Sequence, residues 1–268
     1  MEQSDWAELR QAELATTIIG HNIRFFPSVG STNDMLKEAA RQGAAEGLIF
    51  VTDEQTAGRG RRGRSWTAPA GSSLLVSTLL RPTWLPATHA FMMTILAAVS
   101  VAESLETSTG LRIDLKWPND LQINNRKLGG ILVETELIDT QLLWVVIGCG
   151  INVNWDPTDD SELATTATSI SAELGKPISR RLLLQALLQQ LDTRYSALHR
   201  GARSALFDAW RSRLVTLGQQ VRADTPGGIL LGIAEDVTPD GALLLRDEQG
   251  QRHVVTAGDV SIRPSTST

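Results

Sequence analysis

The sequence contains a single cysteine, Cys149, among its 268 residues. One thiol excludes a disulfide within the chain and every cysteine-rich zinc site, and it is typical of a reducing compartment. The four histidines are isolated from one another and lack the spacing of metal ligands. We therefore expect no metal site built from protein ligands alone.

Long hydrophobic runs are also scarce. The longest apolar helical run covers residues 90–102, which is shorter than the roughly 20 residues that a membrane span needs. The polar first 14 residues contain no hydrophobic signal-peptide core. We expect a cytoplasmic protein without a membrane partner.

The chain has no excess of positive charge, because 25 Lys and Arg residues face 30 Asp and Glu residues, for a net charge of −5. Such a balance argues against a general nucleic-acid binder. A hydrophobic content of 42% and a charged content of 21% are ordinary for a soluble globular protein. The length suits one large domain and a small one.

Basic residues are nevertheless concentrated in residues 58–64, which read Gly-Arg-Gly-Arg-Arg-Gly-Arg and are called the arginine loop below. Glycine lets the backbone approach a ligand closely, and arginine matches carboxylate and phosphate groups. Ordering such a loop while it is empty is costly, because like charges repel and glycine loses backbone entropy. We expect an anionic ligand to order the arginine loop; a solvated basic loop or nucleic-acid patch is the alternative.

Familiar glycine motifs overlap the arginine loop but fail on context. Gly58, Gly60 and Gly63 match the dinucleotide fingerprint, yet residues 66–71 do not open the helix that this motif requires. The P-loop pattern has Arg64 in place of lysine and lacks the same helix. Kinase signature motifs and the G-x-S-x-G elbow of serine hydrolases are absent from the sequence.

Other polar motifs stand at the ends of predicted elements. After a strand over 23–26, Ser31 and Asp34 resemble a capping box that opens a helix ending at Gly43. The spacing favours a plain helix cap, although a helix start also offers free N–H groups to a ligand. Strands are predicted over 48–52 and 72–80, and a helix over 88–105 ending near Gly110.

A hairpin is predicted around Asn124-Asn125. Its first strand, 111–117, leads into Lys116-Trp117-Pro118-Asn119-Asp120, and its second strand carries Lys127 and the pair Gly129-Gly130. Adjacent glycines in a strand indicate close approach by a ligand or another backbone. A surface ion pair between Lys116 and Asp120 is the plainer alternative.

The most hydrophobic strand, 142–151, should be central, and Asn152 at its exit is well placed to meet a ligand. A polar loop over 156–168 and helices over 179–199 and 202–214 follow. From residue 217 onward, short strand-like runs (220–223, 229–237, 243–247 and 252–260) alternate with turns, which predicts a small β-barrel.

Five motifs, in this order, resemble those of biotin protein ligases: Gly30-Ser31-Thr32-Asn33, residues 55–64 with Trp66, Lys116 to Asp120, Lys127 to Glu134, and Gly150-Ile151-Asn152. The resemblance runs from about residue 23 to 263. It implies an α+β fold: a mixed sheet with flanking helices, like the catalytic core of class II aminoacyl-tRNA synthetases, over 23–216, and an SH3-like barrel over 217–263. A leader over 1–22 and a disordered tail over 264–268 complete the expected organisation.

The resemblance also implies an activity. An ATP-dependent ligase would activate biotin as biotinyl-5'-AMP and transfer it to a lysine of a biotin carboxyl carrier protein domain, from acetyl-CoA carboxylase or another biotin-dependent carboxylase. Its substrates would be ATP and biotin, with Mg²⁺. A lipoate or octanoate ligase of the same superfamily is the runner-up, and a non-catalytic nucleic-acid or ligand-sensing module is the alternative of another class.

Residue roles are likewise implied by the resemblance. Ser31, Thr32 and Gln55 would bind the ureido ring, Arg61 and Lys127 the carboxylate and phosphate oxygens, and Arg64 the pyrophosphate. Asn119, Asp120 and Asn152 would organise Mg²⁺, the phosphate or the incoming lysine. The expected catalytic residues are Lys127, Asp120 and Arg61. The expected binding residues are Ser31, Thr32, Asn33, Gln55, Gly58, Arg59, Gly60, Arg61, Arg62, Arg64, Trp66, Lys116, Asn119, Lys127, Gly129, Gly130 and Asn152.

Many bacterial relatives carry an N-terminal winged-helix domain. Here about 22 residues precede the first predicted strand, fewer than the ~50 of a small domain. We therefore expect no DNA partner. The sequence leaves the oligomeric state open, a homodimer included.

Overall fold

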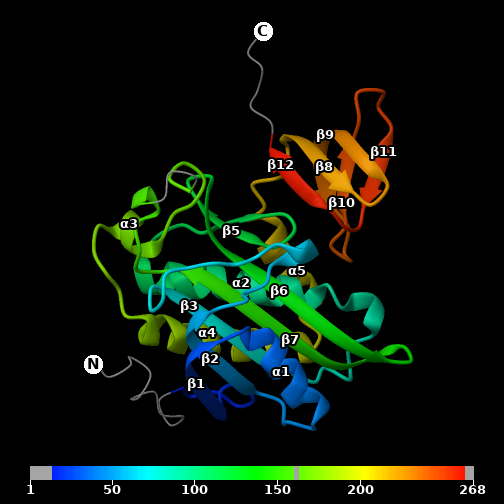
Figure 1. The fold of residues 1–268 in the computed structure, drawn as a ribbon. Helices are drawn as coiled ribbons and strands as arrows, with labels where there is room; N and C mark the ends of the chain where they lie inside the picture. The colour runs from blue at the N-terminus through cyan, green and yellow to red at the C-terminus, as the bar shows by residue number, and fades with distance from the viewer. Residues whose placement is uncertain (1–13, 160–162, 263–268) are drawn as a thin grey trace.

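The computed structural model describes residues 14–159 and 163–262, which form two β-sheets with helices packed around the larger one (Figure 1). Most of the expected leader and the whole expected tail over 264–268 lie outside the described residues, as do residues 160–162 of the predicted polar loop.

The larger sheet has seven strands in the order β1-β2-β3-β7-β6-β5-β4. The strands are β1 Asn22–Val29, β2 Leu48–Gln55, β3 Ser73–Leu80, β4 Asp114–Lys116, β5 Asp120–Ile123, β6 Arg126–Ile138 and β7 Gln141–Asn152. Only β1 and β2 pair in parallel, so the sheet is mixed, as expected. The apolar strand β7 lies at its centre, which confirms the expected position.

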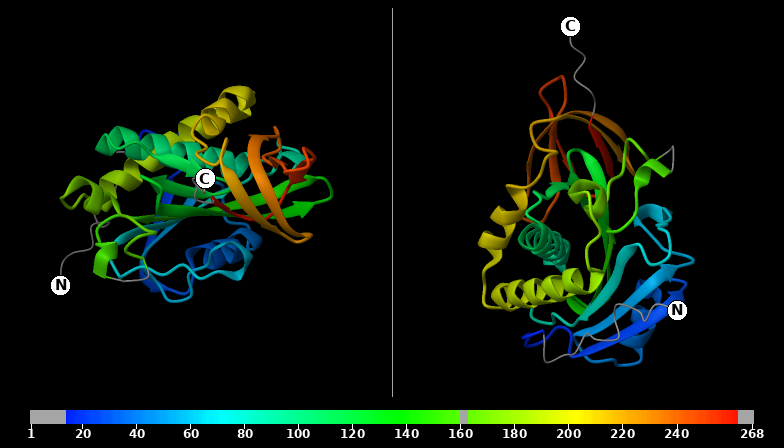
Figure 2. Two further views of the ribbon diagram at one scale, coloured as in Figure 1. Left: turned by 90° about the horizontal axis from the view of Figure 1, so that it is seen from above. Right: turned by 90° about the vertical axis from the view of Figure 1, so that its left-hand side faces the viewer.

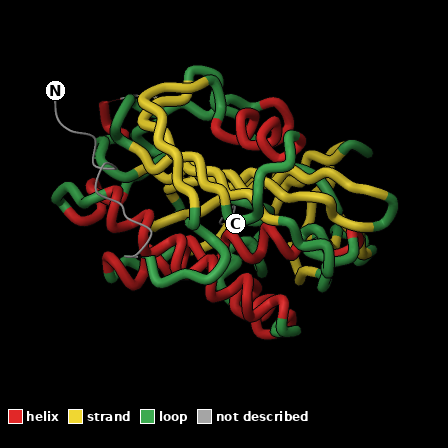
Figure 3. The backbone as a smooth tube through the Cα atoms, turned by 90° about the horizontal axis from the view of Figure 1, so that it is seen from below, coloured by secondary structure: helices red, strands yellow, loops and turns green. Residues whose placement is uncertain are grey.

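Helices cover both faces of this sheet (Figures 2 and 3). Helix α1, Thr32–Arg41, packs Leu36 and Ala40 against Phe50 and Trp144 on one face. On the other face lie α2 Met92–Thr109, α4 Arg180–His199 and α5 Arg203–Arg211, which share the main core with the sheet. Helices thus cover both faces of the central strands, and every residue of β3 is buried.

Residues 87–109, which include α2, are long and apolar enough to cross a membrane, and no other helix in the described ranges is. The apolar run over 90–102 lies largely within this helix, which ends at its cap Gly110 as the sequence predicted. Its most apolar window is 72% buried inside the protein. Burial of this extent is typical of a helix in a protein core, and such helices pass the same test of length and apolar composition.

Local signals in the sequence are confirmed at several element ends. The Ser31 side chain accepts a hydrogen bond from the Asp34 N–H and caps α1. Ser179 caps α4 in the same way. Asn124 and Asn125 both have positive φ, 52° and 62°, as the tight hairpin turn between β5 and β6 requires.

Several predicted bounds differ from the structure; the helix predicted over 202–214, for example, is α5 and ends at Arg211. Strand β4 has three residues rather than the predicted 111–117. The N–H of Leu111 donates to the Thr109 side chain and that of Ile113 to Glu106, so neither joins a strand. The predicted polar loop ends before a short helix, α3 Ile170–Leu174, whose cap Ser169 was not recognised in the sequence.

The smaller sheet is antiparallel, in the order β11-β10-β9-β8-β12. The strands are β8 Gln220–Thr225, β9 Gly228–Val237, β10 Leu243–Arg246, β11 Arg252–Val255 and β12 Asp259–Ile262. The predicted run over 252–260 is thus two strands, and β12 returns to pair with β8. This pairing brings the last strand of the chain close to the arginine loop.

A turn before β10 fixes the smaller sheet to the larger one. The Trp117 indole N–H donates to the Gly241 carbonyl oxygen at 2.9 Å. Gly241 has φ +81°, and a Cβ added there would meet the Phe91 ring at 1.9 Å. The turn therefore requires glycine both for its backbone and for its packing.

Gly241→Ala should lower the free energy of unfolding more than Gly250→Ala. Gly250 has φ +80° and open space around it, so alanine there should cost only the left-handed conformation, about 1–2 kcal/mol. Overpacking against Phe91 should add about 1–3 kcal/mol at Gly241. Urea unfolding of both variants measures the difference, and equal losses would contradict the docking role of the turn.

Candidate active site

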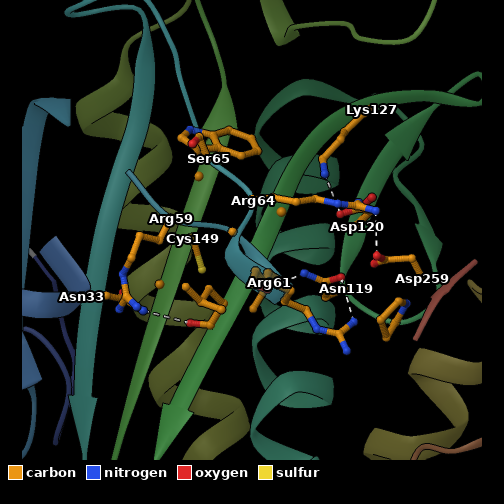
Figure 4. A pocket seen from close by; sticks show the side chains of 18 of the residues that line it. Asn33, Arg59, Arg61, Arg64, Ser65, Asn119, Asp120, Lys127, Cys149 and Asp259 are labelled. Carbon is orange, nitrogen blue, oxygen red and sulfur yellow. Dashed lines mark hydrogen bonds and ion pairs between the residues drawn. The ribbon is translucent and has the colours of Figure 1, made fainter. Parts of the chain in front are cut away.

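A pocket of about 320 Å³ lies where the two sheets meet (Figure 4). It is lined by the start of α1, the arginine loop, the residues before β5, the glycines of β6 and β7, the strand β8 and the edge strand β12. Segments far apart in the sequence thus converge on one cavity.

Most of the expected residues line this pocket: Ser31, Thr32, Asn33, Gln55, Arg59, Gly60, Arg61, Arg64, Trp66, Lys116, Asn119, Asp120, Lys127 and Gly130. Four expected residues are not brought to its lining: Gly58, Arg62, Gly129 and Asn152. Lining residues that sequence reasoning missed include Ser65, Cys149, Gly150, Asp224, Asp259 and Ser261.

The arginine loop closes on itself. Its two arms pair through a bridge between Arg59 and Ser65, and the Gly60 N–H donates to the Arg64 carbonyl oxygen at 2.7 Å. At the base of the loop, Trp66 N–H donates to Gly58 O, and a Cβ on Gly58 would lie 2.4 Å from the Trp66 carbonyl oxygen. Gly58 therefore permits the closure without facing the pocket.

Three of the four arginines in the loop are paired with carboxylates of the protein. Arg59 contacts Asp34 and Glu134, while Arg62 and Arg64 both contact Asp259 on β12, at 3.4 and 2.7 Å. The loop thus receives much of its counter-charge from the protein. The sequence could not reveal these partners, since Asp259 lies 195 residues beyond Arg64.

Arg61 differs from its neighbours, because no ion pair joins it to a carboxylate among the described residues. Its Nη1 donates a long hydrogen bond, 3.4 Å, to the Asn119 side-chain oxygen. Burial lowers the pKa of Arg61, and the nearby charges of Asp259 and Asp120 oppose this shift. A guanidinium remains charged at neutral pH, so Arg61 presents a partly desolvated cation to the pocket.

Two lysines complete the positive lining. Lys127 Nζ lies 2.8 Å from Asp120 Oδ1 and 5.8 Å from the centre of the Trp66 ring. Burial lowers the pKa of Lys116; Asp120 opposes the shift, and Lys127 and Arg64 add to it. Cations therefore outnumber carboxylates around the cavity, which suits a ligand with several negative charges.

Paired glycines make room for Trp66. Gly130 on β6 and Gly150 on β7 are cross-strand partners. A Cβ on Gly150 would lie 2.7 Å from the Trp66 indole, whereas one on Gly130 would make ordinary contacts at 3.6 Å or more. The indole N–H is buried and has no hydrogen-bond partner, so Trp66 brings an unused donor to the cavity wall.

The side chains of Asn152 and Cys149, near the exit of β7, support the structure rather than present reactive groups to the pocket. Asn152 is buried, and its amide donates to the Thr168 carbonyl oxygen at 3.0 Å. The N–H of Thr168 in turn donates to the Lys127 carbonyl oxygen. Asn152 thus supports the backbone beside Lys127. Burial raises the pKa of the Cys149 thiol to about 12, so this lining residue is an inert small side chain.

Comparisons with known proteins identify relatives over most of the chain. Residues 25–152 match the family model described as Biotin/lipoate A/B protein ligase family, and residues 216–263 match Biotin protein ligase C terminal domain. The bifunctional ligase/repressor BirA of Bacillus subtilis is 35% identical over 245 residues, which cover 91% of this chain and 75% of that protein.

The biotin–[acetyl-CoA-carboxylase] ligase of Mycobacterium tuberculosis is also 35% identical, over 86% of this chain and 85% of that protein. Among solved structures, the biotin protein ligase from Aquifex aeolicus in complex with biotin and ATP aligns with a TM-score of 0.77 at 27% identity. That alignment covers 92% of this chain and all of the other.

Gly150→Ala should destabilise the protein by about 1–3 kcal/mol, because the new methyl group collides with the indole, and Gly130→Ala should cost less. Combining Gly150→Ala with Trp66→Ala removes the collision. The cost of the alanine should therefore be smaller in the Trp66→Ala background than in the wild type. Urea unfolding of the four proteins needed for this cycle tests the packing; identical costs in both backgrounds would contradict it.

Proposed function

The chain belongs to the biotin protein ligase family, and we propose that it activates biotin with ATP as biotinyl-5'-AMP and transfers the biotin to a lysine of a biotin carboxyl carrier protein domain. The single observation that carries this function is the convergence of Arg61, Arg64, Lys116 and Lys127 on one pocket, next to the hydrogen-bonding groups of Thr32 and Gln55.

The first half-reaction sets an anion against an anion. An oxygen of the biotin carboxylate bonds to the α-phosphorus of ATP, and the bond to the bridging oxygen breaks as pyrophosphate leaves with its electron pair. Cations must neutralise both partners and the leaving group. Arg61 and Lys127 are the residues we assign to the carboxylate and α-phosphate oxygens, and Arg64 to the pyrophosphate. Asp120, 2.8 Å from Lys127, holds that ammonium group in place.

The second half-reaction needs a neutral amine. The uncharged carrier lysine attacks the carbonyl carbon of the mixed anhydride, and an amide bond forms as the bond from that carbon to the phosphate oxygen breaks. AMP leaves with the electron pair, and the amine nitrogen releases a proton to solvent. The positive surroundings formed by Lys116 and Lys127 favour the uncharged form of an incoming amine. The closed arginine loop limits access of water to the anhydride.

Recognition of biotin is assigned to the start of α1 and the end of β2. The Thr32 N–H and hydroxyl both donate to the Gln55 side-chain oxygen, at 2.8 and 3.1 Å. These bonds fix the orientation of the Gln55 amide and leave its N–H groups for the ureido oxygen. Ser31 lines the same end of the pocket.

We also assign Mg²⁺ to the reaction, as an ion that enters with ATP. Among the residues that the structure describes, no group of three or more His, Cys, Asp or Glu side chains could hold a metal. Magnesium in nucleotide sites uses one or two carboxylates together with substrate phosphates. Asp120 and Asn119 are the oxygen ligands at hand, and the ion would supply further neutralisation of phosphate charge.

We expect the reaction to take place in the cytoplasm.

Pyrophosphate exchange into ATP should depend on biotin and not on lipoate. The measurement follows labelled pyrophosphate with each acid in turn, and then transfer of biotin to a purified carrier domain of acetyl-CoA carboxylase. Exchange with lipoate alone would assign the protein to the lipoate branch of the superfamily. Binding of nucleic acid without any exchange would contradict an adenylating function.

Lys127→Ala should lower the exchange rate about 100-fold or more, because it removes a cation from the developing negative charge. Arg126→Ala is the matched control. Arg126 is the preceding residue, but its side chain pairs with Glu173 rather than lining the pocket. If Lys127→Ala catalysed pyrophosphate exchange as fast as the control, Lys127 would have no role in adenylate formation.

A further inference from the structure

A second cluster of charges lies beside the pocket and contains Asp34, Lys37, Arg59 and Glu134. It joins α1, the arginine loop and β6. A single nitrogen of Arg59, Nη2, lies 2.6 Å from Asp34 Oδ1 and 2.8 Å from Glu134 Oε2. Lys37 Nζ contacts the same two carboxylates, at 2.8 and 2.7 Å. Arg59 is therefore the link between this cluster and the loop.

The cluster continues inward through Asn33. The Asn33 amide donates to Glu134 Oε2 at 2.9 Å and to the Leu132 carbonyl oxygen at 3.2 Å. Its side-chain oxygen accepts from the Ser77 hydroxyl at 2.6 Å. The amide of Asn33 is thus fully used within the protein, although Asn33 was expected to bind a ligand.

Ser77 connects this chain of contacts to the residues that face biotin. Its hydroxyl also lies 2.7 Å from the Thr32 hydroxyl, which donates to the Gln55 side-chain oxygen. Thr32 and Asn33 are 3% and 4% exposed, and Ser77 is fully buried. A continuous path of close polar contacts therefore leads from the loop arginine to the recognition end of the pocket, and within it the single proton of the Ser77 hydroxyl is donated to either Asn33 or Thr32 (Figure 4 shows Arg59 beside Asn33).

Close packing and charge keep this path in one arrangement. A Cβ on Gly148 would lie 2.2 Å from Asn33 Oδ1, so only glycine leaves room for the amide. Burial raises the pKa of Glu134, but hydrogen bonds from Lys37, Asn33 and Arg59 outweigh it, and the net pKa lies below the ordinary value. Glu134 is consequently an anion at neutral pH.

We propose that Glu134 is a positioning residue that couples closure of the arginine loop, through Arg59, to the orientation of Asn33, Thr32 and Gln55. The inference rests on the proposed function, because the coupled groups are those that hold biotin and its adenylate. In this arrangement, opening of the loop removes the Arg59 contact from Glu134 and thereby loosens the contacts that run through Asn33 and Ser77 toward Thr32. Retention of the reactive adenylate and recognition of biotin then depend on the same set of contacts.

Lys37 provides a matched control. It neutralises Glu134 and Asp34 at distances similar to those of Arg59, but it belongs to α1 and contacts no residue of the loop through an ion pair. Removing Arg59 leaves Glu134 paired with Lys37, and removing Lys37 leaves it paired with Arg59. Both changes delete one cation from the cluster. They differ in one respect, because only the loss of Arg59 removes a contact that holds the arginine loop.

The test compares the dissociation rate of biotinyl-5'-AMP from the full-length protein carrying Arg59→Ala, Glu134→Gln, both changes together, or Lys37→Ala. Arg59→Ala and Glu134→Gln should each raise that rate roughly twofold to fivefold, as expected for a partly exposed ion pair. The dissociation rate of the double variant should be close to that of either single variant, because both substitutions break the same Arg59–Glu134 ion pair. Lys37→Ala should change the rate less than twofold.

A second readout separates positioning from lost folding. Glu134→Gln should also raise the KM for biotin while kcat falls less, and its thermal unfolding should follow that of Lys37→Ala. Arg59→Lys should restore part of the retention. Equal effects of Lys37→Ala and Arg59→Ala, or additive effects in the double variant, would overturn the coupling. A wild-type protein that forms no adenylate would instead overturn the proposed function.

Discussion

A carboxylate can react with a polyphosphate only if cations around the pocket neutralise both anions, and those cations repel one another. Arg61, Arg64, Lys116 and Lys127 line one cavity. The chain offsets their repulsion with carboxylates placed to one side, among them Asp120 beside Lys127 and Asp259 beside Arg64. Each carboxylate belongs to a different strand, so the cations stay in place only when the strands are correctly assembled.

The smaller sheet is therefore part of the site. Strand β12 pairs with β8 and carries Asp259, which holds two arginines of the loop. The turn at Gly241, packed against Phe91 and bonded to Trp117, fixes where that strand lies. Trp117 itself belongs to the Lys-Trp-Pro-Asn-Asp segment that supplies Lys116, Asn119 and Asp120. Docking of the sheet and placement of the cations thus depend on one another.

Local patterns in the sequence predicted most of the elements, and the resemblance indicated most of the residues that line the pocket, but neither revealed the partners of those residues. The cap at Ser31, the Asn124-Asn125 turn and the central apolar strand all have short-range signals, and the structure confirms them. Asp259 has no such signal, since its role depends on a contact with Arg64 across 195 residues. Asn152 was placed correctly at the strand exit, yet its side chain turns to Thr168. Strand position fixes an exit point, whereas side-chain direction depends on neighbours far along the chain.

Holding the cations with protein carboxylates has a further consequence for the order of events. Pyrophosphate removes much of the negative charge from the pocket when it leaves, and a loop ordered by ligand charge alone would then open. The ion pairs of Arg59 with Glu134 and of Arg64 with Asp259 involve no ligand atoms. They can keep the arginine loop closed while the adenylate waits for the carrier lysine. In the proposed reaction, protein counter-charge would thus shield the anhydride during the interval in which ligand charge is lowest.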